Sequence, residues 1–254
     1  MAGLLIPRAG EVVRPYLIGR RYGVSVSAAF ASIILERLVD LVTVLLLFAL
    51  YLYALPPPAS QAQGELMDLI KLGGGFTGVV ALAVTAVLVG FHVHAERTVG
   101  LLDRLLFKLP ERFAAPVSRA LRSFAGGLGV LRASPSQLAR IFGQSLLLWL
   151  VIAAGAFWSF RAFDVELPFH ASFLLLAFLT VGVAIPTPGM VGGFHEAYRL
   201  ALTQVFGVAA GPAVAGGLSM HFFTNLPVLL IGLALLGSEG LTLGKVTEMS
   251  EKQP

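Results

Sequence analysis

The sequence predicts an all-α polytopic membrane protein with about four full spans and one broken or re-entrant helix pair. Of its 254 residues, 57% are hydrophobic and only 13% are charged, whereas soluble chains carry roughly 25% charged residues. The hydrophobic residues gather in long runs that are separated by charged, proline-rich or glycine-rich stretches. A soluble domain with so few charged side chains could not cover its surface. We therefore treat residues 1–254 as a single transmembrane domain.

Four long apolar runs predict the complete spans. The first covers about residues 31–55 and ends at Pro56, Pro57 and Pro58, because proline cannot continue a helix. The second covers about residues 72–92 and is rich in glycine and valine, which membrane helices tolerate. The third covers about residues 141–160, and the last covers about residues 212–236.

Between the third and last runs, the sequence predicts a broken helix pair formed by residues 169–186 and 194–206. The break contains Pro186, Pro188, Gly189, Gly192 and Gly193. Irregular backbone at membrane depth is tolerated only where it is buried in protein or lines a wet cavity. Freed backbone amides at the start of the following helix would favour an anionic group, and a phosphate is the natural candidate. The alternative is a tight turn that joins two complete spans.

Residues 94–140 differ from the rest of the chain because they hold eight of its 18 basic residues. These are Arg97, Arg104, Lys108, Arg112, Arg119, Arg122, Arg132 and Arg140. Leucines recur at helical spacing between them, which predicts one or two amphipathic helices on the cytoplasmic surface. The alternative is an ordinary solvated loop helix.

Basic residues near the spans predict the orientation of the chain in a plasma membrane. The N-terminal segment carries Arg8, Arg14, Arg20 and Arg21, whereas the 56–71 and 161–168 loops carry only Lys71 and Arg161. The N-terminal segment, the 94–140 loop and the C-terminus are therefore expected to face the cytoplasm. The net charge of +4 then reflects cytoplasmic loops beside anionic lipid and predicts no nucleic-acid partner.

A shift of 185 residues predicts an internal repeat, with copies at about residues 1–55 and 169–236. The shift aligns Glu11 with Glu196 and Arg14 with Arg199. It also aligns Glu36 with His221 and Asp40 with Asn225. The predicted spans of the two copies run in opposite directions, which is typical of transporters with inverted-topology repeats. The first copy looks incomplete, which predicts at least one further hydrophobic segment upstream.

Three charged residues lie close together near the start of the first span. Glu36 and Asp40 share a helix face, and Arg37 is placed to pair with Asp40. Charges in hydrocarbon are costly, so these side chains are expected to face protein or a polar cavity. Glu11 with Arg14, and Glu196 with Arg199, repeat an acid-to-base spacing of three. The functional interpretation is a path for a polar headgroup or for protons. The alternative is an ion network that holds helices in register.

The remaining motifs are few. His195 and His221 could shuttle protons, or they could be hydrogen-bonded core residues; His92 and His94 sit at an interface and are weaker candidates. The sequence has no cysteine, which removes disulfides and thiolate metal sites. It also lacks zinc, phosphate-loop, nucleophile-elbow and dinucleotide motifs. We therefore expect no cofactor, no bound metal and no ATP-driven pumping by this chain.

These motifs, taken in order, resemble the lysylphosphatidylglycerol synthase transmembrane family, also called flippase-like integral membrane proteins. The resemblance rests on Arg8-Ala9-Gly10-Glu11 with Arg14, then Glu36-Arg37 with Asp40, then Pro186, Pro188, Gly189 and Gly192 before an acid. It covers nearly the whole chain. The resemblance implies the membrane half of a factor that moves aminoacylated phosphatidylglycerol between leaflets. Stand-alone members are mostly uncharacterised, and some archaeal ones are tied to dolichol-linked glycosylation.

Several departures limit what the resemblance implies. Residues 1–254 do not include the family's soluble aminoacyltransferase domain or its opening hydrophobic segments, so the resemblance is not taken to imply lipid synthesis. Met190 stands where the family usually has a second glycine, and His195 stands at the usual position of the acid, which here follows as Glu196. The site residues that the resemblance implies are Glu11, Arg14, Glu36, Arg37, Asp40, Pro188, Gly189 and Glu196.

The sequence therefore predicts a non-enzymatic, flippase-like protein that moves or reorients an anionic phospholipid or a lipid-linked headgroup. Its expected partners are membrane lipids, and a homodimer is compatible with the sequence. One alternative is a scaffold for envelope lipid or glycan synthesis that acts through the 94–140 segment. The other is a lipid-linked glycosyl transferase that uses Glu36 or Asp40 as a base.

Overall fold

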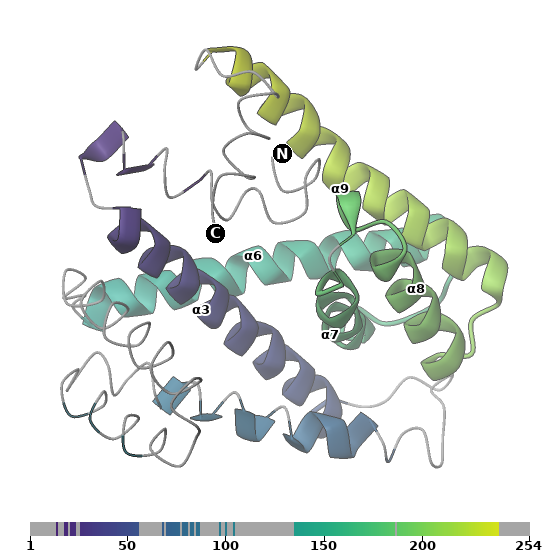
Figure 1. Cartoon of the computed structure of the whole chain (residues 1–254). Helices are drawn as coiled ribbons and strands as arrows, with labels where there is room; N and C mark the ends of the chain where they lie inside the picture. The colour runs from purple at the N-terminus through teal and green to yellow at the C-terminus, as the bar shows by residue number, and fades with distance from the viewer. Residues whose placement is uncertain are drawn as a thin grey trace. The chain divides into compact units, whose positions relative to one another are not determined.

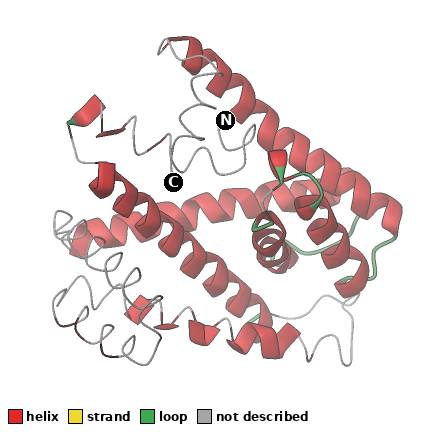
Figure 2. Cartoon of the chain, viewed as in Figure 1, coloured by secondary structure: helices red, strands yellow, loops and turns green. Residues whose placement is uncertain are grey.

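The computed structural model describes residues 26–55, 70–76, 78–80, 135–185 and 187–238, with short stretches between 14 and 23 and between 68 and 104. These residues are mostly helical, and no strand occurs among them (Figure 2). The predicted all-α class is thereby confirmed. Most of the predicted 94–140 segment lies outside the described residues, as do Glu11, His92, His94 and Pro186.

In the part of the chain that the structure describes, three helices are long enough to cross a bilayer: α3 (Val26–Tyr53), α6 (Pro135–Ala162) and α9 (Ala210–Ser238) (Figure 1). Of the described helices, α6 and α9 are also apolar enough, over Ser136–Ala162 and Ala210–Ala234. The helix α3 differs because every stretch of 18 residues within it contains Glu36, Arg37 and Asp40. Among the described residues, two helices are thus both long and apolar enough to span a membrane, and the larger number of spans stays a prediction.

Between α6 and α9 the chain forms shorter helical pieces, and it breaks where the sequence predicts a break. Helix α7 (Ala171–Val183) has 13 residues, which at 1.5 Å per residue is about 20 Å, short of a hydrocarbon core of about 30 Å. A 3-10 turn, η1 (Pro188–Met190), leads into α8 (Gly193–Leu200). A π-helical turn, η2 (Ala201–Val205), follows directly. Entry of these pieces into the membrane stays a prediction.

The chain divides into two compact units. The α3/α6 unit contains the first parts of these two helices, through Val42 and Ser145. The α7–α9 unit contains the remaining parts of α3 and α6 and everything from α7 to α9. Within this second unit, α7 lies beside α8, and α8 lies beside α9 (Figure 1).

The core of the α7–α9 unit is built around α7. This helix is apolar on every side, and residues 171–176, Leu179 and Gly182 are buried, as expected for a helix without a polar face. Tyr198 of α8 and Phe160 of α6 are fully buried in the same core. A side chain on Gly182 would come within 2.4 Å of the Gly193 carbonyl oxygen. The backbones of α7 and α8 therefore touch at these two glycines.

Large apolar side chains cover the outside of α6 and α9. On α6 these exposed residues are Leu146, Leu147, Leu148, Val151 and Trp158. On α9 they are Val214, Leu218, Phe222, Phe223, Val228, Leu230, Ile231 and Leu233. Soluble proteins rarely expose contiguous apolar surface on this scale, so these faces are suited to contact with lipid.

Candidate functional site

In the α3/α6 unit, Arg14 and Glu36 form a two-pronged ion pair. Arg14 Nη1 donates to Glu36 Oε1 at 2.9 Å, and Arg14 Nη2 lies 2.9 Å from Glu36 Oε2. The Arg14 side chain is 51% exposed and that of Glu36 is 40% exposed. The hydrogen bond to Glu36 raises the pKa of Arg14 above its already high value, against a smaller opposing effect of burial. The guanidinium therefore stays charged at any physiological pH.

Asp40, one turn further along α3, has a different partner from the one the sequence favours. Its Oδ1 accepts a hydrogen bond of 2.7 Å from the hydroxyl of Ser145 on α6. Ser145 is buried and Arg37 is exposed. No ion pair joins Arg37 to Asp40 among the described contacts. The structure thus brings Glu36 to Arg14 and Asp40 to Ser145, and it leaves Arg37 on the surface.

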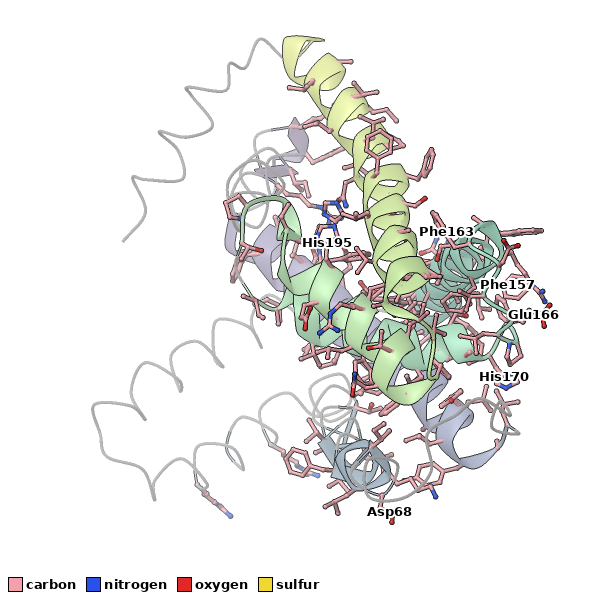
Figure 3. All side chains as sticks on the ribbon, turned by 90° about the vertical axis from the view of Figure 1, so that its right-hand side faces the viewer. Asp68, Phe157, Phe163, Glu166, His170 and His195 are labelled. Carbon is pink, nitrogen blue, oxygen red and sulfur yellow. The ribbon has the colours of Figure 1, made fainter. Side chains whose placement is uncertain are left out.

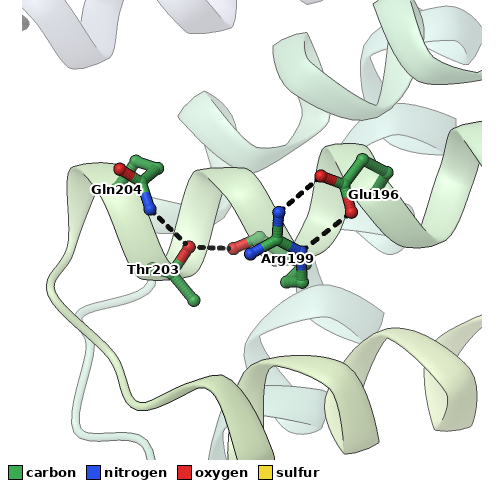
Figure 4. A network of polar contacts seen from close by, with 4 residues as sticks. All are labelled: Glu196, Arg199, Thr203 and Gln204. Atoms are coloured by element: carbon green, nitrogen blue, oxygen red, sulfur yellow. Dashed lines mark hydrogen bonds and ion pairs between the residues drawn. The ribbon is translucent and has the colours of Figure 1, made fainter.

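In the α7–α9 unit, Glu196 and Arg199 form a second two-pronged pair, at the spacing of three that the sequence predicts (Figure 4). Arg199 Nε donates to Glu196 Oε2 at 2.8 Å, and Nη2 donates to Oε1. The Arg199 side chain is 34% exposed and that of Glu196 is 54% exposed. Thr203 donates to the Arg199 carbonyl oxygen at 2.9 Å, and Gln204 donates to Thr203. This network joins α8 to η2.

The break between α7 and α8 contains three residues with positive φ. These are Gly189 at 62°, Met190 at 59° and Gly192 at 92°. Glycine adopts such values at little cost, but a side chain with a Cβ does not. The two glycines therefore allow the chain to reverse between the short helices. Met190 stands where the family that this sequence resembles usually has a glycine. Its backbone is strained, because a residue with a Cβ rarely adopts a positive φ.

Replacing Met190 with glycine is expected to leave the folded chain more stable than replacing it with alanine, because both changes remove the Met190 side chain from the core but only glycine removes the left-handed strain of about 1 kcal/mol. Alanine at the same position keeps the Cβ and the strain, so Met190→Ala is the matched control. Unfolding midpoints in detergent micelles would rank the glycine variant above the alanine variant. Equal midpoints would show that this turn is not strained.

The two predicted histidines meet beside this break. The Gly192 N–H donates to His195 Nδ1 at 3.3 Å, and His221 Nε2 lies 2.7 Å from the Gly189 carbonyl oxygen. The two imidazole ring centroids are 4.6 Å apart. Figure 3 shows His195 beside α9. Asn225, one turn beyond His221, donates to the His221 carbonyl oxygen at 2.8 Å, so its amide is engaged within its own helix.

Sequence reasoning missed three of these features. Ser145 gives no sign of its role, because a serine in an apolar run is common and its partner lies 105 residues away. The contact of Arg14 with Glu36 also joins residues that are distant in the sequence, 22 positions apart. The interior glycine of α7, Gly182, could have been noticed as a small residue that permits close helix approach. In the part of the chain that the structure describes, no cluster of three or more His, Cys, Asp or Glu side chains could hold a metal ion.

Comparison with known proteins identifies the family. The chain is 23% identical to glycosyltransferase AglD of Haloferax volcanii over 265 aligned positions, which cover 96% of this chain and 42% of that protein. The chain thus spans less than half the length of this curated relative. No solved structure matches it. The profile of the lysylphosphatidylglycerol synthase TM region matches residues 1–232. The chain therefore belongs to this family and is a membrane protein, as the resemblance of its motifs predicts.

Proposed function

We propose that this chain binds the phosphate of an anionic phospholipid or lipid-linked headgroup and moves or reorients it between leaflets. The observation that carries the proposal is the pair of partly exposed arginines, Arg14 and Arg199, each held by a glutamate through two nitrogens. A carboxylate and a phosphate present the same two-oxygen edge to a guanidinium. Each glutamate therefore occupies the position that a phosphodiester would take.

Exposure makes such an exchange feasible. Ion pairs that are open to solvent contribute little to stability, so an arriving phosphate can displace the glutamate at small cost. Planar two-pronged binding also makes arginine more selective for phosphate than lysine, whose ammonium is a point charge. The adjoining helices present apolar surface suited to acyl chains, as on α9 with Phe222 and Phe223. Headgroup and acyl chain would then contact different parts of the protein.

Several features support the internal repeat on which this transport proposal draws. The predicted shift of 185 residues places Arg14 on Arg199, and it places the end of α3 at Tyr53 on the end of α9 at Ser238. Each long helix is preceded by a glycine with φ of 67°, Gly23 before α3 and Gly207 before α9. In this proposal the two copies have opposite orientations in the plasma membrane. The N-terminal segment, the 94–140 loop and the C-terminus face the cytoplasm.

The name of the relative favours a second candidate. Glycosyltransferase AglD is 23% identical to this chain over an alignment that covers 96% of the chain. The second candidate function is therefore the transfer of a sugar to a lipid-linked acceptor. Asp40, on α3, is the carboxylate that would act as base in that case. The two candidates differ in outcome, because transport leaves the lipid chemically unchanged whereas transfer yields a new covalent product. We favour transport because the paired arginines suit binding of a phosphate.

The test is the leaflet accessibility of labelled phosphatidylglycerol in proteoliposomes. Arg14→Lys and Arg199→Lys are each expected to slow lipid movement by about tenfold, because lysine keeps the charge but loses the two-pronged contact. Arg161→Lys is the matched control, since this exposed arginine packs over the ring of Phe157 instead of holding a carboxylate. It should leave the rate of lipid movement within about twofold of the unmodified chain, as expected for a surface change away from the headgroup contacts.

Two results would contradict the proposal. Absence of lipid movement in the unmodified, folded chain would favour a scaffold, whose expected contacts lie in the 94–140 segment. Equal rates in all three lysine variants would show that the paired arginines do not bind the headgroup. A glycosylated lipid product on incubation with an activated sugar would instead favour the second candidate.

A further inference from the structure

We propose that His195 and His221 form a proton-binding pair that controls how tightly α9 holds the break between α7 and α8. The contact involved is the hydrogen bond between His221 Nε2 and the Gly189 carbonyl oxygen, 2.7 Å long. This bond joins α9 directly to the turn that separates the two short helices. The link between this pair and lipid movement rests on the proposed function, whereas proton binding by the pair does not.

The hydrogen bonds determine where each ring carries its proton. A carbonyl oxygen only accepts, so His221 Nε2 must donate, and the free lone pair of a neutral His221 is on Nδ1. His195 Nδ1 accepts from the Gly192 N–H, so the proton of a neutral His195 is on Nε2. The only nitrogen lone pair of a neutral His195, on Nδ1, is therefore already engaged in a hydrogen bond. No described residue donates a hydrogen bond to His221 Nδ1.

An incoming proton from water therefore binds His221 at Nδ1. Protonation of His195 at Nδ1 would break the hydrogen bond that this nitrogen accepts from the Gly192 N–H. The loss of this bond would destabilise the N-terminus of α8. Two charged rings would also repel each other with their centroids 4.6 Å apart. The pair thus takes up one proton, and it takes it on His221.

Protonation changes the strength of one bond. A hydrogen bond from a charged donor is roughly twice as strong as one between neutral groups. The charged His221 therefore holds the Gly189 carbonyl more tightly, and loss of the proton loosens the contact between α9 and the break. Histidine is the side chain that undergoes this charge change between pH 5 and 8.

No neighbouring titratable group competes for this role in the described part of the unit. The helices α7, η1 and η2 contain no titratable side chain, and His221 is the one such residue on α9. On α8, Glu196 and Arg199 pair with each other. The remaining α8 group, Tyr198, shares a hydrogen bond with Ser159 of α6. Arg161, at the exposed end of α6, is bound over Phe157.

A cysteine placed in the break would measure this contact. The chain has no natural cysteine, and the hydroxyl oxygen of Thr187 is buried without a hydrogen-bond partner among the described residues. Thr187→Cys thus substitutes a thiol of similar size. The full chain carrying this change would be reacted with a maleimide in liposomes at about pH 5 and about pH 8. At each pH, the maleimide reaction rate of Thr187→Cys is divided by the rate of the double variant that also carries His221→Gln. This division removes the direct effect of pH on the reactivity of the thiol.

The expected ratio is about tenfold lower at the acidic pH, because the charged contact opens less often. Adding His195→Asn should keep this pH dependence, since the asparagine oxygen can still accept from the Gly192 N–H and His221 Nδ1 keeps its free lone pair. His170→Gln, at the start of α7, is the matched histidine control and should also keep it. A ratio that is independent of pH, or one that rises in acid, would overturn the proposal.

A second measurement needs no substitution at the pair and guards against variants that fail to fold. In the chain with ¹⁵N-labelled histidine and with His92, His94 and His170 replaced by glutamine, only the His195 and His221 rings carry the label. One of these two rings should gain a proton at Nδ1 between about pH 5 and pH 8 while the other remains neutral. Charging of both rings in this range would overturn the proposal. The accessibility and nitrogen signals do not depend on lipid movement, so failure of the transport proposal would be recognised separately.

Discussion

Replacing Tyr198 with alanine is expected to reduce the free energy of unfolding by about 3–5 kcal/mol, the usual cost of emptying a buried aromatic site. The Tyr198 side chain is fully buried. Its ring contacts α9 at two glycines, where an added Cβ on Gly216 would lie 2.7 Å from the tyrosine oxygen and one on Gly217 would lie 3.2 Å from the ring. Tyr198 thus fills the space between α8, α9 and α6. Denaturation in mixed detergent micelles, followed by circular dichroism, would measure the loss.

Tyr198→Phe separates the packing of this ring from its hydrogen bond. The hydroxyls of Tyr198 and Ser159 lie 2.7 Å apart, and Ser159 donates its one proton to the Ala156 carbonyl oxygen. Tyr198 must therefore be the donor between the two. Phenylalanine leaves Ser159 with its bond to Ala156, so the expected loss is only about 1 kcal/mol. Equal losses in the alanine and phenylalanine variants would contradict the packing described for α8.

Replacing Gly182 with alanine is expected to have the next largest effect on stability. The new Cβ would lie 2.4 Å from the Gly193 carbonyl oxygen and 2.6 Å from the Ala197 Cβ. Neither atom belongs to a flexible side chain, so α7 and α8 must separate. The expected cost is at the upper end of the roughly 1–3 kcal/mol that overpacked cores show. The same micelle denaturation would measure it.

Gly155→Ala is the matched control for this substitution. Gly155 is also inside a helix, α6, but a Cβ there meets no atom within 4 Å. Alanine favours helix over glycine by roughly 1 kcal/mol, so this variant should be as stable as the unmodified chain or more so. If both glycine variants lost stability equally, close contact between α7 and α8 could not be the cause.

Much of the helical layout could be predicted from the sequence because apolar runs and their interruptions are local signals. The predicted last span, 212–236, falls within two residues of each end of α9. The predicted third span, 141–160, starts too late, since α6 begins at Pro135. Proline is favoured at the first turn of a helix, and the polar residues that follow it hid this start. The helix α6 thus extends well beyond its apolar part.

The contacts of the candidate site could be predicted only where both partners belong to one helix. Glu196 and Arg199 are three residues apart, so helical geometry alone brings them together. Glu36 and Arg14 are separated by 22 residues, and Asp40 and Ser145 by 105. Such pairs depend on how helices pack, which apolar patterning does not specify. For the same reason, local spacing suggested Arg37 as the partner of Asp40, whereas packing brings Ser145 to it.

The π-helical turn η2 has a geometric consequence for the second arginine. A π turn contains one more residue than the α-helical turn that it replaces. Arg199 precedes this turn, and Gly207 follows it, three residues before α9 begins at Ala210. Rewinding η2 into α-helix would rotate the chain before it by about 100° and advance it by about 1.5 Å relative to the chain after it. A change of Ala201–Val205 between the π and α forms would therefore turn Arg199 about the helix axis by about 100° relative to Phe206, which directly follows η2.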